Sequence, residues 1–225
     1  CPAAPAALVV ALALGCLAAG PAAASDGPAP PTLREVLVGG GPIPGGLIDR
    51  ALDAGYPLRT TYGSTETASQ ICTTAAGQGP GALRTAGRPL SCWELRLDAD
   101  GAIAVRGAPL PLALLGDDGP APAVDPDGWY RTGDLGTLDV EGRLTVLGRA
   151  DAMFISGGEN IHPEAIERAL GGHPTVAEAV VVPVPDERYG ARPVAFVTTV
   201  EGEALDPAAL GAHLERTLPR FMVPD

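Results

Sequence analysis

The chemically richest stretch of the chain is TTYGSTET, residues 60–67. It combines an aromatic ring at Tyr62, a glycine at Gly63, several hydroxyl groups and one carboxylate at Glu66. An aromatic ring can stack on a base, a glycine lets the backbone approach a phosphate closely, and a carboxylate oxygen suits a hard divalent cation. The same residue types fill ordinary loops, so the stretch alone is equally consistent with a turn between two strands.

Four other segments combine glycine with polar or charged side chains. They are GGGP at 39–42, WYRTGD at 129–134, GRAD at 148–151 and SGGEN at 156–160.

Hydrophobic patterning indicates which elements carry the first of these segments. An apolar run at 33–38 predicts a strand, the glycines at 39–42 a turn, and 47–54 a helix that ends at Gly55. Residues 58–61 predict a second strand. A strand, turn, helix and strand in this order form a βαβ unit and favour a parallel sheet. Because ligands bind beyond the carboxyl ends of the strands in such sheets, we expect both polar loops to meet at one crevice.

The middle of the chain has the sequence pattern of an antiparallel β-sheet. Residues 92–97 and 102–106 alternate around a short turn and predict a β-hairpin. Pro, Gly and Asp dominate 109–126, which predicts a surface loop. Residues 144–147 predict a further strand, preceded by a hairpin turn at 140–143.

The last part predicts a small α+β domain with the order βαββα. Its expected elements are a strand at 153–156, a helix at 163–170, strands at 176–183 and 194–200, and a helix at 207–218. The fold class is therefore α/β: the end of a large α/β domain with a small antiparallel β unit, followed by a small α+β C-terminal domain. We expect the domains to be 1–149 and 150–225.

Composition excludes some classes of function. The net charge is −12, and no basic stripe interrupts it, which argues against a nucleic-acid surface. All 15 basic residues are arginine. Four cysteines (Cys1, Cys16, Cys72 and Cys92) match neither a zinc site nor a C-x-x-C pair, so we expect reduced thiols. A nucleophilic Cys72 is the less favoured alternative.

An apolar stretch at 6–20 allows two interpretations. It resembles the hydrophobic region of a signal peptide, but no basic residue precedes it and the chain begins with Cys rather than Met. We therefore favour a buried helix, and we expect the sequence to be a fragment.

The order of the motifs carries more information than any one of them. GGGPIP, TYGSTE, WYRTGD and GRADAMFISGGENIHPEAIE follow one another as in the acyl-adenylate-forming (AMP-binding) enzymes, which the chain resembles over about residues 32–224. TYGSTETASQICTT and VVVPVPDERYGARPVAFV most resemble the 2-succinylbenzoate–CoA ligases of menaquinone biosynthesis. SGGENIHPEAIE is also similar to aryl-CoA ligases such as the 4-chlorobenzoate enzymes.

The resemblance implies a two-step reaction. ATP and a carboxylate give an acyl-AMP and pyrophosphate, and the CoA thiol then attacks the acyl carbon and releases AMP. The implied ligands are ATP, Mg²⁺, CoA and a small carboxylic acid, in a cytoplasmic enzyme with neither nucleic acid nor membrane as a partner. A homodimer stays open.

The resemblance also implies roles for the opening stretch. Tyr62 matches the ring that stacks on adenine, and Gly40 and Gly41 match the loop that lines the adenine and acyl pockets. Gly63 and Ser64 would touch the acyl group. A core or rim tyrosine and an ordinary tight turn are the structural alternatives.

Charged and hydroxyl groups complete the implied nucleotide site. Thr65 matches a catalytic, phosphate-contacting hydroxyl and Glu66 the catalytic Mg²⁺ ligand. Asp134 matches the carboxylate that accepts hydrogen bonds from the ribose hydroxyls, and Arg149 its partner. The alternatives are a solvated Glu66 and a structural Asp134–Arg149 ion pair, and Arg131 is expected to be structural.

The C-terminal motifs match parts of a moving domain. Asp151 matches the hinge residue, and Gly157 and Gly158 match the loop along which pantetheine passes. Tyr189 either lies against CoA or belongs to a core. His162 is expected to be a surface residue at the start of a helix rather than a base.

Two features of the family are absent from the printed sequence. The Ser/Thr/Gly-rich phosphate loop is missing, and so is the catalytic lysine, since the chain has no lysine at all. We therefore expect this polypeptide alone not to adenylate. A carrier-protein-loading adenylation module and a non-catalytic nucleotide-binding remnant are the competing hypotheses.

Overall fold

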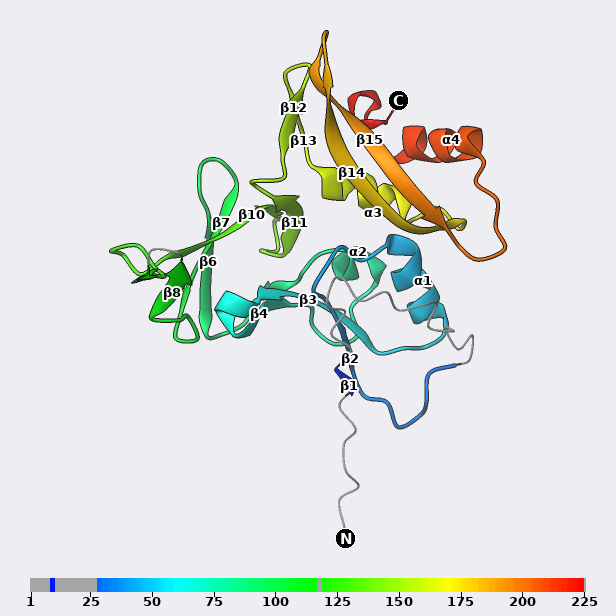
Figure 1. The fold of residues 1–225 in the computed structure, drawn as a ribbon. Helices are drawn as coiled ribbons and strands as arrows, with labels where there is room; N and C mark the ends of the chain where they lie inside the picture. Colours follow the sequence, from blue (N-terminus) through cyan, green and yellow to red (C-terminus); the bar gives the residue numbers. More distant parts are fainter. Residues whose placement is uncertain (1–8, 11–27, 117–118, 225) are drawn as a thin grey trace. The chain divides into compact units, whose positions relative to one another are not determined.

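The computed structural model describes residues 9–10, 28–116 and 119–224 (Figure 1). It divides into two compact units. The first comprises residues 1–132 and 136–146, and the second comprises 133–135 and 147–225. The division therefore passes through two neighbouring strands. The expected functional boundary after residue 149 stays a prediction.

The first unit contains the predicted βαβ unit. Strand β2 (Val36–Val38) leads into helix α1 (Gly45–Asp53) and strand β3 (Leu58–Ser64), and β2 and β3 are parallel. Parallel pairing and the crossover helix are confirmed, although α1 begins two residues earlier than predicted. The short strands β1 (Val9–Val10), β4 (Ser69–Thr73) and β5 (Arg88–Pro89) extend the sheet to the order β1–β2–β3–β4–β5.

The helix expected at residues 6–20 is wrong where the structure describes this stretch. Val9 and Val10 form β1, which pairs in parallel with Val36 and Leu37. The pairing with β2 supplies backbone hydrogen bonds for these two residues in the strand conformation. The other residues of the stretch lie outside the described part of the chain.

The second sheet contains the predicted hairpin. Strands β6 (Trp93–Leu97) and β7 (Ala102–Gly107) pair antiparallel, with Leu95 opposite Val105. Strands β10 (Tyr130–Leu138) and β11 (Leu144–Arg149) complete the order β11–β10–β7–β6. A short helix, α2 (Pro80–Leu83), precedes this sheet.

The surface loop predicted at 109–126 is partly wrong. Strands β8 (Ala113–Gly116) and β9 (Gly119–Pro122) form a two-stranded ribbon within it. Leu112 and Leu115 are almost fully exposed, so the segment is superficial, as expected, although it is not irregular throughout.

The second unit has one strand more than predicted. Strand β12 (Phe154–Ser156) turns through Gly157 and Gly158 into β13 (Glu159–Ile161), which the sequence pattern did not indicate. Helix α3 (Pro163–Leu170), strands β14 (Val176–Asp186) and β15 (Gly190–Thr199), and helix α4 (Pro207–Thr217) follow as expected. The order is therefore ββαββα, with a final 3₁₀ turn at Arg220–Met222.

Each unit has its own hydrophobic core. In the second unit both helices pack on the β14–β15 ribbon, as Figure 1 shows, with Ile166, Leu170, Val181 and Leu214 buried between them. In the first unit, Ile71, Trp93, Ile103 and Leu144 lie in one cluster, and Ile48, Leu58 and Leu83 lie in another. Apolar burial of this kind supplies the main stabilising free energy of each unit.

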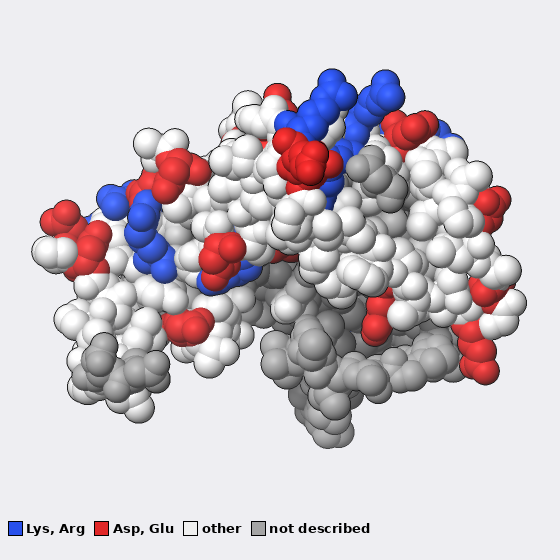
Figure 2. Space-filling model, turned by 45° about the horizontal axis from the view of Figure 1, so that its top comes forward, with Lys and Arg blue, Asp and Glu red and all other residues white. Residues whose placement is uncertain are grey.

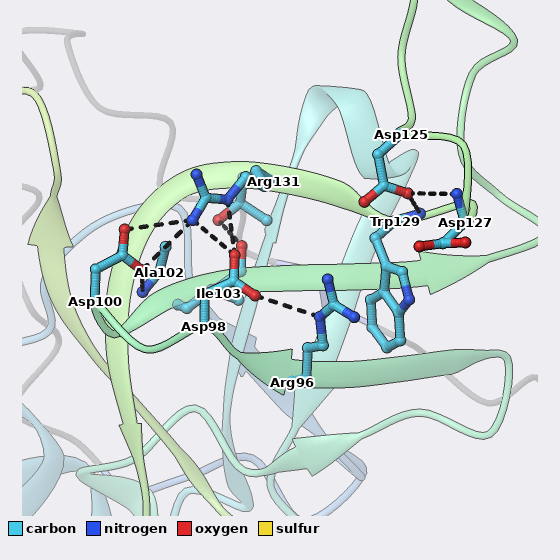
Figure 3. A network of polar contacts seen from close by, with 10 residues as sticks. Arg96, Asp98, Asp100, Ala102, Ile103, Asp125, Asp127, Trp129 and Arg131 are labelled. Carbon is cyan, nitrogen blue, oxygen red and sulfur yellow. Dashed lines mark hydrogen bonds and ion pairs between the residues drawn. The ribbon is translucent and has the colours of Figure 1, made fainter.

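Charged side chains of the first unit neutralise one another at the surface. Arg131 reaches Asp98 at 2.7 Å and Asp100 at 3.3 Å (Figure 3), which agrees with its expected structural role. The guanidinium groups of Arg96 and Arg106 lie 4.2 and 4.8 Å from the Trp129 ring centroid. On the face shown in Figure 2, basic groups accordingly lie beside acidic ones rather than forming a basic stripe.

Candidate functional site

The segment 60–67 is not simply a loop, which corrects the initial expectation. Strand β3 continues through Tyr62 and Gly63 to Ser64, pairing antiparallel with β4, and a 3₁₀ turn over Thr65–Thr67 follows. The strand extends because Tyr62 lies opposite Cys72 and packs at the rim of the core that contains Trp93. Thr65 and Glu66 are thus presented at the end of a strand.

Gly63 is required by the backbone at a β-bulge. The register between β3 and β4 shifts between Tyr62 and Gly63, which places Gly63 against the backbone of Ser69. A Cβ atom at Gly63 would collide with the Ser69 carbonyl oxygen. The neighbouring backbone is unusual as well, since Ala68 and Ser69 have φ angles of 55° and 131°. Bulges of this kind redirect the chain near functional sites.

Thr67 holds the 3₁₀ turn in place. Its Oγ1 accepts a hydrogen bond from the Ser64 N–H at 2.9 Å and reaches the Ser64 and Ser69 carbonyl oxygens at 3.0 and 3.2 Å. The side chain is only 1% exposed. Sequence reasoning missed this residue, because the usual capping signal has Glu or Gln three residues after the Ser or Thr, whereas this position holds Thr67.

The turn leaves Thr65 exposed and Glu66 half-buried at the first helical positions. Within the ranges that the structure describes, no three His, Cys, Asp or Glu residues gather as a group that could hold a metal ion. Magnesium is commonly bound by one or two carboxylates together with substrate phosphates. A single carboxylate beside a hydroxyl therefore fits that mode of binding.

The glycine loop after β2 lies one strand away from this turn. Gly39 packs so closely on Thr61 that an added Cβ would lie 2.6 Å from the Thr61 carbonyl oxygen. Gly40 has a φ angle of 89°, and the position of a Cβ at Gly41 is open. Since β2 and β3 are parallel neighbours, their carboxyl ends place 39–41 and 62–66 at the same edge of one sheet, as predicted.

Asp134, Arg149 and Asp151 form a charged cluster within the second unit. Arg149 Nη1 lies 3.5 Å from Asp134 Oδ1, and the guanidinium donates to both carboxylate oxygens of Asp151 at 3.1 and 3.2 Å. Asp134 is 15% exposed, whereas Arg149 is 50% exposed. The Asp134–Arg149 ion pair that we weighed as the structural alternative is thus present, and it leaves the nucleotide role of Asp134 untested.

The contacts within the cluster shift the pKa values of Asp151 and Arg149. The hydrogen bond from Arg149 is the main cause that lowers the pKa of Asp151. Conversely, the Asp151 hydrogen bond and the Asp134 charge raise the pKa of Arg149. Asp151 and Arg149 therefore remain charged at neutral pH.

Gly157 and Gly158 form the turn between β12 and β13 and have φ angles of 60° and 90°. The Gly157 N–H donates to the Tyr189 carbonyl at 2.9 Å, and a Cβ at Gly157 would lie 3.0 Å from the Tyr189 ring. Tyr189 is 39% exposed, with the Arg188 and Arg192 guanidinium groups 5.0 and 5.6 Å from its centroid. It is therefore a surface ring beside the glycine turn.

Cys72 and His162, which we expected not to be catalytic, are both at least partly buried. Cys72 is fully buried, and burial raises the pKa of its thiol to about 12, which argues against a nucleophile. His162 is the residue before helix α3, as predicted, but it is half-buried rather than on the open surface.

The structure therefore brings the predicted residues together in two groups. The first unit holds Gly40, Gly41, Tyr62, Gly63, Ser64, Thr65 and Glu66, and the second holds Asp134, Arg149, Asp151, Gly157 and Gly158. Their assigned roles stay predictions.

Comparison with known proteins defines the class. The sequence model of the AMP-binding enzymes matches residues 2–109, and that of the AMP-binding enzyme C-terminal domain matches residues 165–225. Together the two models cover most of the chain. The chain belongs to the AMP-binding enzymes.

Within this class, the chain is similar to one kind of ligase. It is 40% identical over 208 residues to the 2-succinylbenzoate–CoA ligases of Bacillus thuringiensis subsp. konkukian (strain 97-27) and Bacillus cereus (strain AH820). The match covers 88% of this chain and 43% of either relative, so the chain spans less than half of their length.

Solved structures agree with this relationship. The o-succinylbenzoate coenzyme A synthetase (MenE) of Bacillus subtilis in complex with ATP and magnesium ion is similar at a TM-score of 0.78 and 35% identity, over 88% of this chain and 42% of that one. Its complex with the acyl-adenylate intermediate gives a TM-score of 0.77 at 34% identity over the same shares.

Proposed function

We propose that this chain supplies nucleotide-binding and CoA-facing elements of an ATP-dependent acid–CoA ligase. The proposed reaction converts 2-succinylbenzoate to 2-succinylbenzoyl-CoA through an acyl-AMP. The observation that carries the proposal is the 40% identity to 2-succinylbenzoate–CoA ligases over 208 residues, a range that includes most of the described chain.

In the proposed first step, an oxygen of the acid attacks the α-phosphorus of ATP and pyrophosphate leaves. Tyr62 would stack on the adenine, and the two oxygens of Asp134 would accept hydrogen bonds from the ribose hydroxyls. Thr65 would contact the phosphates, and Glu66 would hold Mg²⁺. The ion, when bound, supplies neutralisation of phosphate charge. The strand end and the capped turn would preorganise Tyr62, Thr65 and Glu66, and such positioning lowers a reaction barrier.

In the proposed second step, the CoA thiol attacks the acyl carbon and AMP leaves. Gly157 and Gly158 would let pantetheine pass, because neither carries a side chain, and the exposed Tyr189 ring beside them offers a surface for CoA. Asp151 would be the hinge for the change between the two steps, since a few backbone angles can absorb such a motion.

A panel of acids tests the substrate. The protein, expressed from its complete reading frame, is incubated with ATP, Mg²⁺, CoA and one acid at a time, and the thioester is identified by mass spectrometry. We expect 2-succinylbenzoate to give product, whereas benzoate, 4-chlorobenzoate and fatty acids give at least about tenfold less. Another aryl- or fatty-acyl-CoA synthetase is the alternative if one of those acids is preferred, and ATP binding without any product would indicate a non-catalytic remnant.

The proposal includes a cytoplasmic location. Among the described residues, no helix is long and apolar enough to cross a membrane. A homodimer is an open alternative to a monomer, and sedimentation velocity of the protein decides between the two.

A further inference from the structure

The first turn of helix α3 contacts the end of strand β11, 15 residues earlier in the chain. The Glu164 carboxylate oxygen Oε1 accepts a hydrogen bond from the backbone N–H of Arg149 at 2.9 Å. Its second oxygen, Oε2, is buried and makes no hydrogen bond within the described part of the chain. A charged acceptor makes this a stronger contact than a neutral one would be.

Gly148 makes room for this carboxylate. Its φ angle of 151° is one that side-chain-bearing residues rarely adopt, and a Cβ there would collide with the Glu164 carboxylate. The backbone at Gly148 and the acid at Glu164 are therefore fitted to each other.

The same arginine is held at its other end. The Arg149 guanidinium lies over Gly133, where a Cβ would be 2.9 Å from the guanidinium nitrogens, and it contacts both Asp134 and Asp151. The next residue, Ala150, donates its N–H to the Gly133 carbonyl at 2.9 Å. Consequently, Glu164 holds the backbone of Arg149, whose side chain contacts both Asp134, the candidate for ribose binding, and Asp151, the candidate hinge residue.

We propose that Glu164 is a positioning residue that clamps Gly148 and Arg149 in one of the two states separated by a rotation at Asp151. The clamp itself is a feature of the fold, and its link to two catalytic states rests on the proposed function. Glu164 does not touch the substrate in this proposal. In the clamped state, Glu164 fixes the backbone at Arg149 and thereby the position of the Arg149 side chain, which contacts Asp151.

Helix α3 offers a matched control for this clamp. Glu167, one turn further on, accepts the backbone N–H of Val181 at 2.9 Å, so it makes the same kind of bond away from Arg149. Amide hydrogen exchange is measured for the wild type, E164A, E164Q and E167A. We expect E164A to speed exchange at the Arg149 amide about tenfold, because a charge-assisted bond is lost. E164Q, which keeps one acceptor oxygen, is expected to speed it less, and E167A not at all.

A functional measurement adds a readout that loss of stability alone would not move. With the protein from its complete reading frame, acyl-AMP formation and thioester formation are timed separately. We expect E164A to change the ratio of the two rates at least about fivefold, E164Q to restore much of it, and E167A to leave it unchanged. Arg149 exchange within twofold of wild type in E164A, equal acceleration in E167A, or an unchanged ratio would each overturn the proposal. If the wild type forms no acyl-AMP, the proposed function fails, while the exchange result still reports on the clamp.

Discussion

The hydroxyl of Thr67 provides a sharp test of how the Thr65–Glu66 turn is positioned. Replacing Thr67 by Val keeps the shape of this 1% exposed side chain but removes the acceptor for the Ser64 N–H and the donor to the neighbouring carbonyls. Loss of such a cap costs about 1–2 kcal/mol of unfolding free energy. Thr67→Ser is the control, because it keeps the hydroxyl and loses one methyl group, worth about 0.8 kcal/mol.

Tryptophan fluorescence isolates the relevant unit during urea unfolding. The chain has two tryptophans, and both Trp93 and Trp129 belong to the first unit. Trp93 also donates its indole N–H to the Gln70 carbonyl at 2.8 Å, on the strand that follows the turn. We expect T67V to lower the unfolding free energy of this unit more than T67S does. An unfolding free energy for T67V equal to that of wild type, or a larger loss in T67S, would refute the capping role.

Three further predictions concern other groups. Iodoacetamide at pH 8 should label Cys92, which is exposed, and spare Cys72, and peptide mass spectrometry would show the difference. Because burial raises the thiol pKa of Cys72 from 9.0 to about 12, the contribution of this thiol to stability is full below pH 9 and is lost as the pH rises toward 12. C72A should remove this pH dependence from the unfolding curves. Asp134→Asn should weaken AMP binding about tenfold in calorimetry while leaving the fold intact by circular dichroism, and equal affinity would exclude the ribose role. The 225-residue chain by itself should release no pyrophosphate from ATP and 2-succinylbenzoate, and turnover above a no-protein blank would contradict the expectation based on its missing lysine and phosphate loop.

The regular part of the fold was predictable because its residues follow simple periodicities. The helix that became α1, the hairpin β6–β7 and the helix α3, opened by Pro163, match their predicted positions closely. In each of these, apolar spacing, turn residues and end signals agree, so local preference and tertiary packing favour the same structure.

The missed elements depend on pairing with distant strands. Gly63 has a low strand propensity, yet β3 extends through it to Ser64 because β4 supplies hydrogen-bonding partners. Strand β13, at Glu159–Ile161, is only three residues long and carries no alternating pattern, so only its pairing with β12 defines it.

The candidate site was predictable in its residues but not in its supports. Motif order indicated Glu66 and Asp134, whereas Thr67 and Glu164 gain their roles from contacts that no local pattern records. Glu164 lies in the first turn of α3, where its charge favours the helix N-terminus, and it also accepts a hydrogen bond from the Arg149 backbone. Contacts of this kind require the three-dimensional fold.

The central proposal, that these residues serve adenylation of 2-succinylbenzoate, is tested most directly by ATP–pyrophosphate exchange. The protein from its complete reading frame is assayed with Mg²⁺, with and without 2-succinylbenzoate, beside the variant E66Q. We predict exchange that requires the acid and falls at least about a hundredfold in E66Q, because the amide is a poorer ligand for magnesium. Exchange that is independent of the acid, or that E66Q leaves unchanged, would contradict the assignment of this site.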